Sequence, residues 1–142
     1  MKKVGLVTIT ILISLLLSGC GQKKETITCV QKAEDMEATF NIVLVDNVIG
    51  DMNIDYNANL ESYSNESIEA IKKQDFCATF EESMAEYKGA FTDCKTSVEN
   101  KHLNLSTKID INKVTTNKNQ KNITSQDIKE QFEKKGYSCT IK

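Results

Sequence analysis

The chain has 142 residues and a formal net charge of −2 at pH 7, and it contains no proline and no tryptophan. This length allows one domain with a modest hydrophobic core rather than two domains. Its charge balance lacks the basic excess that nucleic-acid binding requires, so we expect no nucleic-acid partner.

The first twenty residues have the pattern of an export signal. Lys2 and Lys3 precede an apolar run over residues 4–17, which is shorter than the roughly 20 residues that a membrane-spanning helix needs. A basic start followed by a short apolar run is typical of a signal peptide. The run ends in LSGC (residues 17–20), which resembles the lipobox of bacterial lipoproteins. This resemblance implies cleavage before Cys20 and attachment of diacylglycerol to the Cys20 thiol.

The lipobox divides the chain into three parts. We expect a signal peptide at residues 1–19, a lipidated tether at residues 20–25 and a single α+β domain at residues 26–142. Removal of the first 19 residues, two of which are lysine, leaves 123 residues with a formal charge of −4. Two acyl chains hold a protein at a bilayer where one chain would exchange. We therefore expect the protein on the extracytoplasmic face of the cell membrane, anchored through Cys20.

The other cysteines are Cys29, Cys77, Cys94 and Cys139. An even number of cysteines in a small exported domain predicts two disulfide bonds. No two of them have the CxxC spacing of zinc sites and redox centres, so we expect no metal and no cofactor. Spacing along the chain alone leaves all three possible pairings open.

The first half of the domain combines strand and helix patterns. Alternating apolar residues predict strands over residues 26–30, 38–45 and 48–56. A stripe of apolar residues predicts helical structure over residues 66–88, either as one helix or as two pieces that meet near residues 74–75. Gly89 is expected to end it.

The second half predicts two further strands, over residues 91–98 and 103–111, and a polar loop over residues 115–122. Thr124 is expected to cap a second helix, and residues 137–141 to form a last strand. The predicted fold is therefore α+β. Its antiparallel sheet has the order β-β-β-α-β-β-α-β, with two helices packed on one face.

These elements rank the disulfide pairings. A helix advances about 15 Å over ten residues, and a strand of four residues returns about 13 Å. Cys77 on the helix and Cys94 on the following strand should therefore lie at a similar height. This geometry favours a Cys77–Cys94 bond, and it leaves Cys29 on the first strand for Cys139 on the last.

Candidates for catalysis are few. His102, the only histidine, lies beside a predicted turn on the polar side of a strand, and Ser83 lies on an exposed part of a helix. The chain has no GxSxG, HExxH or glycine-rich phosphate motif. We therefore expect no enzyme.

Three acidic segments are candidate cation sites: Glu34-Asp35, Glu81-Glu82 and residues 51–57, where oxygen-bearing side chains alternate. The last segment lacks the central glycine and the distal glutamate of a calcium loop. The preferred interpretation of Asp51 and Asp55 is the solvent face of a strand.

The lipobox and two later motifs resemble small Gram-positive lipoproteins of the YehR-like group. The motifs are YKGAF at residues 87–91 and KIDINK at residues 108–113. In that group a lipobox and a polar tether precede a compact domain, in which a helix ending in Tyr-Lys-Gly leads into a hairpin. The resemblance covers residues 17–113, and the four additional cysteines depart from it. It implies an envelope domain, and it carries over no activity and no catalytic residue.

We therefore expect a membrane-anchored lipoprotein that acts as a binding or envelope-accessory module for a protein or a wall polymer. The alternative function is a cell-wall-directed enzyme, or an inhibitor of a secreted or wall enzyme. A concave pocket with converging polar groups and perturbed carboxylates would favour that alternative, and a smooth sheet face would count against it.

Overall fold

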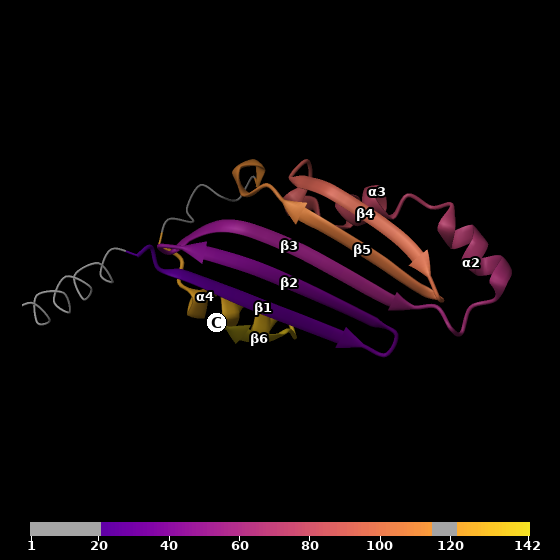
Figure 1. Ribbon diagram of the computed structural model, residues 1–142, viewed down its shortest axis with the longest axis horizontal. Helices are drawn as coiled ribbons and strands as arrows, with labels where there is room; N and C mark the ends of the chain where they lie inside the picture. Colours follow the sequence, from indigo (N-terminus) through magenta and orange to yellow (C-terminus); the bar gives the residue numbers. More distant parts are fainter. Residues whose placement is uncertain (1–20, 115–121) are drawn as a thin grey trace, which may run out of the picture.

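The computed structural model describes residues 21–114 and 122–142, which form an antiparallel sheet with helices (Figure 1). The strands are β1 (Lys24–Ala33), β2 (Met36–Val45), β3 (Val48–Asn59), β4 (Phe91–Glu99), β5 (His102–Ile109) and β6 (Ser138–Ile141). The helices are α2 (Asn65–Lys72), α3 (Phe76–Ser83) and α4 (Ser125–Lys134), with 3-10 turns η1 (Ala85–Tyr87) and η2 (Ile111–Lys113). The predicted α+β class and antiparallel sheet are confirmed.

The strand order is β4-β5-β3-β2-β1-β6. Hairpins join β1 to β2, β2 to β3 and β4 to β5, and the helices after β3 carry the chain to the sheet edge. Both residues of two tight turns have positive φ: Asp46 and Asn47 at 50° and 61°, and Asn100 and Lys101 at 49° and 60°. Two consecutive positive φ angles are typical of the type I′ turn, whose twist matches that of antiparallel strands.

One face of the sheet carries the core. Alternate residues of the central strands are buried there, namely Ile27, Cys29, Phe40, Ile42, Leu44, Met52, Ile54, Leu103, Leu105 and Ile109. Ile128 and Phe132 of α4 pack against this face, as does Phe80 of α3. Ile68 of α2 packs beside Leu103 in a smaller cluster. Because all three helices contact the same face, none of the described helices covers the other.

The described chain has three α-helices rather than the predicted two, because residues 66–88 follow the second alternative and form two α-helices that meet near residues 74–75. α2 ends at Lys72, and the carboxylate of Asp75 then accepts a hydrogen bond from the backbone N–H of Ala78 to begin α3. An aspartate at this position satisfies an N–H that has no partner within the first turn. α3 ends at Ser83, and only a 3-10 turn continues to Tyr87. The apolar stripe therefore runs over three short helical pieces.

Some predicted boundaries also shift. β1 begins inside the predicted tether 20–25, because Lys24 pairs with Val45. β5 ends before residue 111, because the Asp110 carboxylate accepts a hydrogen bond from the Asn112 N–H and starts η2. Of the predicted loop 115–122, only Asn122 lies within the described residues.

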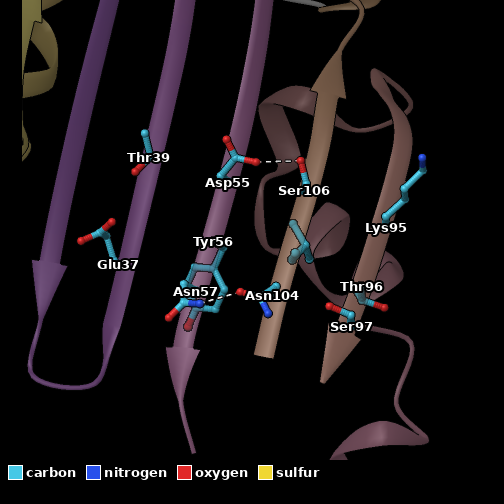
Figure 2. A pocket seen from close by; sticks show the side chains of 11 residues that line it. Glu37, Thr39, Asp55, Tyr56, Asn57, Lys95, Thr96, Ser97, Asn104 and Ser106 are labelled. Atoms are coloured by element: carbon cyan, nitrogen blue, oxygen red, sulfur yellow. Dashed lines mark hydrogen bonds between the residues drawn. The ribbon is translucent and has the colours of Figure 1, made fainter. Parts of the chain in front are cut away.

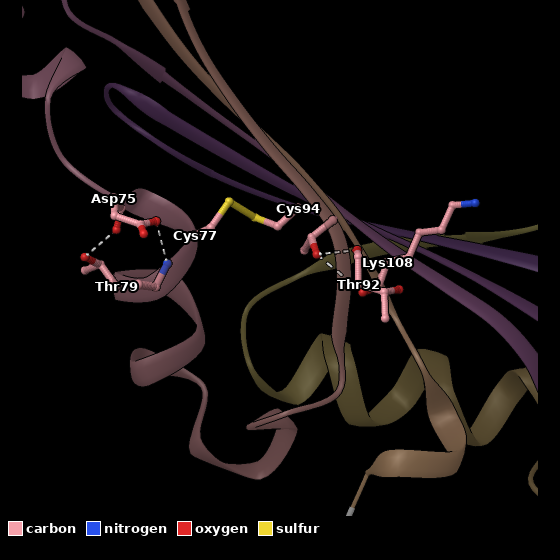
Figure 3. The surroundings of a disulfide bond; sticks show 8 residues. Asp75, Cys77, Thr79, Thr92, Cys94 and Lys108 are labelled. Carbon is pink, nitrogen blue, oxygen red and sulfur yellow. Dashed lines mark hydrogen bonds between the residues drawn. A yellow bond between two sulfur atoms is a disulfide. The ribbon is translucent and has the colours of Figure 1, made fainter.

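Two disulfide bonds join distant parts of the chain, in the two pairs that the predicted geometry favoured. Cys29 and Cys139 lie directly opposite each other on β1 and β6, with Cα atoms 4.1 Å apart. Cys77 and Cys94 connect α3 to β4 across 6.0 Å between Cα atoms (Figure 3). Since α3 has no buried residue, the second bond is a covalent tether for a helix that packs lightly on the sheet.

Candidate functional site

The uncovered face of the sheet is polar. Successive side chains of a strand point to opposite faces, so the residues between the core positions point outward. They include Thr39, Asn41, Asn53, Asp55, Asn57, Asn104, Ser106 and Lys108. Figure 2 shows the part of this face between β2 and β4. Amide and hydroxyl groups predominate over charged groups here.

This face is hollowed across the strands. A hollow of about 480 Å³ is lined by residues of β2, β3, β5 and β4. An adjoining hollow of about 660 Å³ shares Asp55, Lys95 and Ser106 with the first and continues to Asn41 on β2 and Thr26 on β1. We call the two hollows together the polar trough.

Hydrogen bonds between neighbouring strands position the lining of the polar trough. The Ser106 hydroxyl donates to the Asp55 carboxylate at 2.7 Å, and the Asn57 amide donates to the Asn104 side-chain oxygen (Figure 2). Such cross-strand pairs limit side-chain motion. Each pair retains further donor or acceptor capacity, because an amide carries two N–H groups and a carboxylate has two oxygens. The trough is therefore an ordered hydrogen-bonding surface.

The edge strand β4 forms one wall of the polar trough. Its pairing with β5 shifts register between Thr92 and Lys95, and Asp93 has a φ of 53°. A bulge of this kind bends a strand and increases its twist. It also makes the sheet edge a poorer template for pairing with another chain. The bulge thus shapes the wall that carries Lys95.

The predicted candidate residues lie apart. Asp51 and Asp55 belong to β3 and alternate with buried Met52 and Ile54, so the interpretation as a strand face is confirmed. Of the two, Asp55 lines the polar trough. Cys20 lies outside the described residues.

The remaining candidates do not meet. His102 begins β5 opposite Glu99, whereas the Ser83 hydroxyl donates to the Phe80 carbonyl oxygen on α3 at 2.7 Å. The Glu81 carboxylate accepts a hydrogen bond from the Gly89 N–H. Within residues 21–114 and 122–142, no three His, Cys, Asp or Glu side chains are grouped to hold a metal ion.

Sequence reasoning included Asn57 only as part of the candidate cation segment 51–57, and it missed Lys95, Asn104 and Ser106 as site residues. Alternation within each strand could have placed their side chains outward. Alternation could not have predicted that these residues lie close together. Their proximity depends on β5 pairing with β3, and two helices and β4 separate these two strands in the sequence.

Comparison with protein-family models, curated proteins and solved structures finds no match for this chain. The resemblance to YehR-like lipoproteins therefore stays a prediction. In the part of the chain that the structure describes, no helix is both long and apolar enough to span a membrane.

Proposed function

We propose that the protein is a lipid-anchored binding module on the extracytoplasmic face of the cell membrane, and that its polar trough binds a polyhydroxylated wall polymer. The observation that carries this proposal is an uncovered sheet face with an ordered hollow of amides and hydroxyls. Amides and hydroxyls both donate and accept hydrogen bonds, as the hydroxyl groups of a glycan do. The charged groups of the trough are of both signs, three carboxylates (Glu37, Asp55, Asp93) and two lysines (Lys95, Lys108), which suits a polymer of low net charge.

The membrane location is supported by the sequence around Cys20 and by the two disulfides, which persist in oxidising compartments. The backbone N–H of Lys23 donates to the Asp46 carboxylate at 2.9 Å, and the Asp46 N–H donates to the Lys23 carbonyl oxygen at 2.9 Å. The ordered domain thus begins at Lys23. An anchor at Cys20 would hold it within about 10 Å of the lipid attachment.

The shape of the polar trough favours a polymer over a protein as its ligand. The trough crosses five neighbouring strands, or about 19 Å at 4.8 Å per strand. Protein interfaces are usually centred on aromatic or other large anchors. Among the residues that line the first hollow only Tyr56 is aromatic, and its ring packs near Phe80 of α3 on the covered side.

A co-sedimentation experiment with insoluble wall polymer and the detergent-solubilised anchored protein tests this proposal. We expect the wild type to sediment with the polymer. The affinity of the Asn57→Ala, Asn104→Ala double variant for the polymer should be lower by about tenfold or more. This loss corresponds to two or three hydrogen bonds at about 0.5–1.5 kcal/mol each.

The matched control is Gln126→Ala with Glu130→Ala, which removes another exposed side-chain hydrogen bond, on α4. It should bind the polymer as the wild type does. A wild type that stays in the supernatant, or equal binding by the trough variant, would contradict the proposal. Release of soluble fragments from the polymer would instead favour the alternative of a wall-directed enzyme.

A further inference from the structure

A second hollow surface lies on the covered side of the sheet, where the β1–β2 turn comes close to α2 and α3. It has a wider part of about 550 Å³ and a narrower part of about 190 Å³. Both parts are lined by Tyr56, Phe76 and Leu103, so they adjoin each other. We call them together the aromatic groove.

Aromatic and apolar side chains form the walls of the aromatic groove. The narrow part lies between α3 and the sheet, where the rings of Tyr56 and Phe80 have centroids 6.4 Å apart. The wider part is lined by Met36 and Tyr63, which are 47% and 49% exposed. These are two of the three large apolar side chains that the described residues expose. Exposed apolar side chains gathered around a hollow are typical of binding surfaces.

Two carboxylates lie at the mouth of the aromatic groove. Glu34 and Asp35 form the β1–β2 turn and line the wider part. Both are exposed, and within the described chain neither takes part in an ion pair. The neighbouring Lys32 is already paired with Glu37, at 2.7 Å between Nζ and Oε2. The mouth is therefore negative.

The walls themselves are uncharged. Burial, and to a smaller extent the neighbouring Tyr63 phenol, raise the pKa of Tyr56 above its usual value of 10.0. Tyr56 therefore keeps its proton at neutral pH, and its hydroxyl lies 2.7 Å from the Met36 sulfur. Neutral aromatic rings attract cations through their faces, and the attraction is strongest for partly desolvated pairs.

The two parts of the aromatic groove suit different groups of a ligand, an apolar group in the narrow part and a cationic group at the mouth. The narrow part has the size and polarity to accept one aliphatic or aromatic side chain. The mouth combines the Tyr63 ring with the carboxylates of Glu34 and Asp35, which suits a guanidinium or an ammonium group. We propose that the aromatic groove binds an extended peptide segment of a partner protein, in which an Arg or Lys stands close to a large apolar side chain.

The position of the groove favours a protein as its occupant. β1 runs from Lys24 to the turn at the groove, a length of about 30 Å, and Figure 1 shows this turn and α2 at the end of the sheet opposite Lys24. With the proposed anchor at Cys20, this end lies about 30 Å from the anchored start of the domain, where a partner protein can reach it. This step rests on the proposed function, whereas the chemistry of the groove does not.

A random-decapeptide phage library, panned on the immobilised anchored protein, tests the proposal. We expect the enriched peptides to carry Arg or Lys within two positions of a large aliphatic or aromatic residue. The affinity of a synthetic copy, measured by calorimetry, should fall about tenfold or more in Glu34→Gln with Asp35→Asn, and also in Tyr63→Ser. It should weaken at high salt, because exposed charges are screened.

The matched control is Asp51→Asn with Glu130→Gln, which removes the same charge from exposed positions outside the groove. It should leave the peptide affinity unchanged, as should the Asn57→Ala, Asn104→Ala trough variant. Loss of polymer binding by the polar trough and loss of peptide binding by the aromatic groove can therefore be distinguished.

Three results would overturn the inference: no enrichment, enrichment of acidic or wholly polar peptides, or equal losses in the control. A benzyltrimethylammonium ion that binds as tightly as the peptide would also overturn it, and would assign the groove to a small organic cation.

Discussion

Replacement of Cys29 and Cys139 by alanine is expected to lower the free energy of unfolding by about 4–5 kcal/mol. The bond closes a sequence separation of 110 residues, and in the chain-entropy model a loop of that length restricts the unfolded chain by about 4.7 kcal/mol. Both side chains are buried, where β6 adds to the sheet through four paired positions. Urea unfolding followed by circular dichroism measures the loss.

This loss is a large share of the 5–15 kcal/mol that stabilises a typical domain. The wild type and the variant should therefore be compared in the same concentration of trimethylamine oxide, which favours folded states and preserves a folded baseline. A variant that unfolds at the same urea concentration as the wild type would show that the Cys29–Cys139 bond adds no stability.

Replacement of Cys77 and Cys94 by serine is expected to free α3 while the sheet stays folded. Their separation of 17 residues corresponds to about 3 kcal/mol in the same model, which is roughly a hundredfold in an opening equilibrium. α3 has no buried residue that could replace the bond. Amide hydrogen exchange over residues 76–87 should therefore accelerate about a hundredfold, and exchange in β1–β3 should change little.

The Cys77→Ser, Cys94→Ser variant should also change peptide binding, because Phe76 and Phe80 of α3 line the aromatic groove. We expect the selected peptides to lose affinity when α3 is released. Equal acceleration of exchange in all strands would show that the bond stabilises the whole fold rather than α3. Unchanged exchange over residues 76–87 would show that packing alone holds the helix.

Local chemistry made much of the fold predictable. The predicted strands 38–45 and 48–56 leave Asp46 and Asn47 between them; these residue types tolerate positive φ, and both have it in the β2–β3 turn. Gly89 was predicted to end a helix, and it has a φ of 77°, but it follows the 3-10 turn η1 because α3 already ends at Ser83. Gly136, with a φ of 89°, follows the end of α4. The alternation of Phe40, Ile42 and Leu44 predicted the buried face of β2 in the same way.

Long-range pairing made the rest unpredictable. The apolar stripe runs unbroken past Asp75, so it could not distinguish one helix from two that are separated by a capping residue. The polar trough needs β5 beside β3, which depends on the path of the whole segment between them. Tyr56 fitted the pattern of a strand residue that faces the core. Its part in a groove depends on how incompletely α3 covers the sheet.

The intact mass of the protein, extracted from membranes without reducing agent, tests the central claim of an anchored and disulfide-bonded domain most directly. We predict a chain that begins at Cys20, carries the mass of diacylglycerol, and is lighter than its reduced form by four hydrogen atoms, two for each disulfide. A chain that retains residues 1–19, lacks the lipid, or gains no mass on reduction would contradict the account.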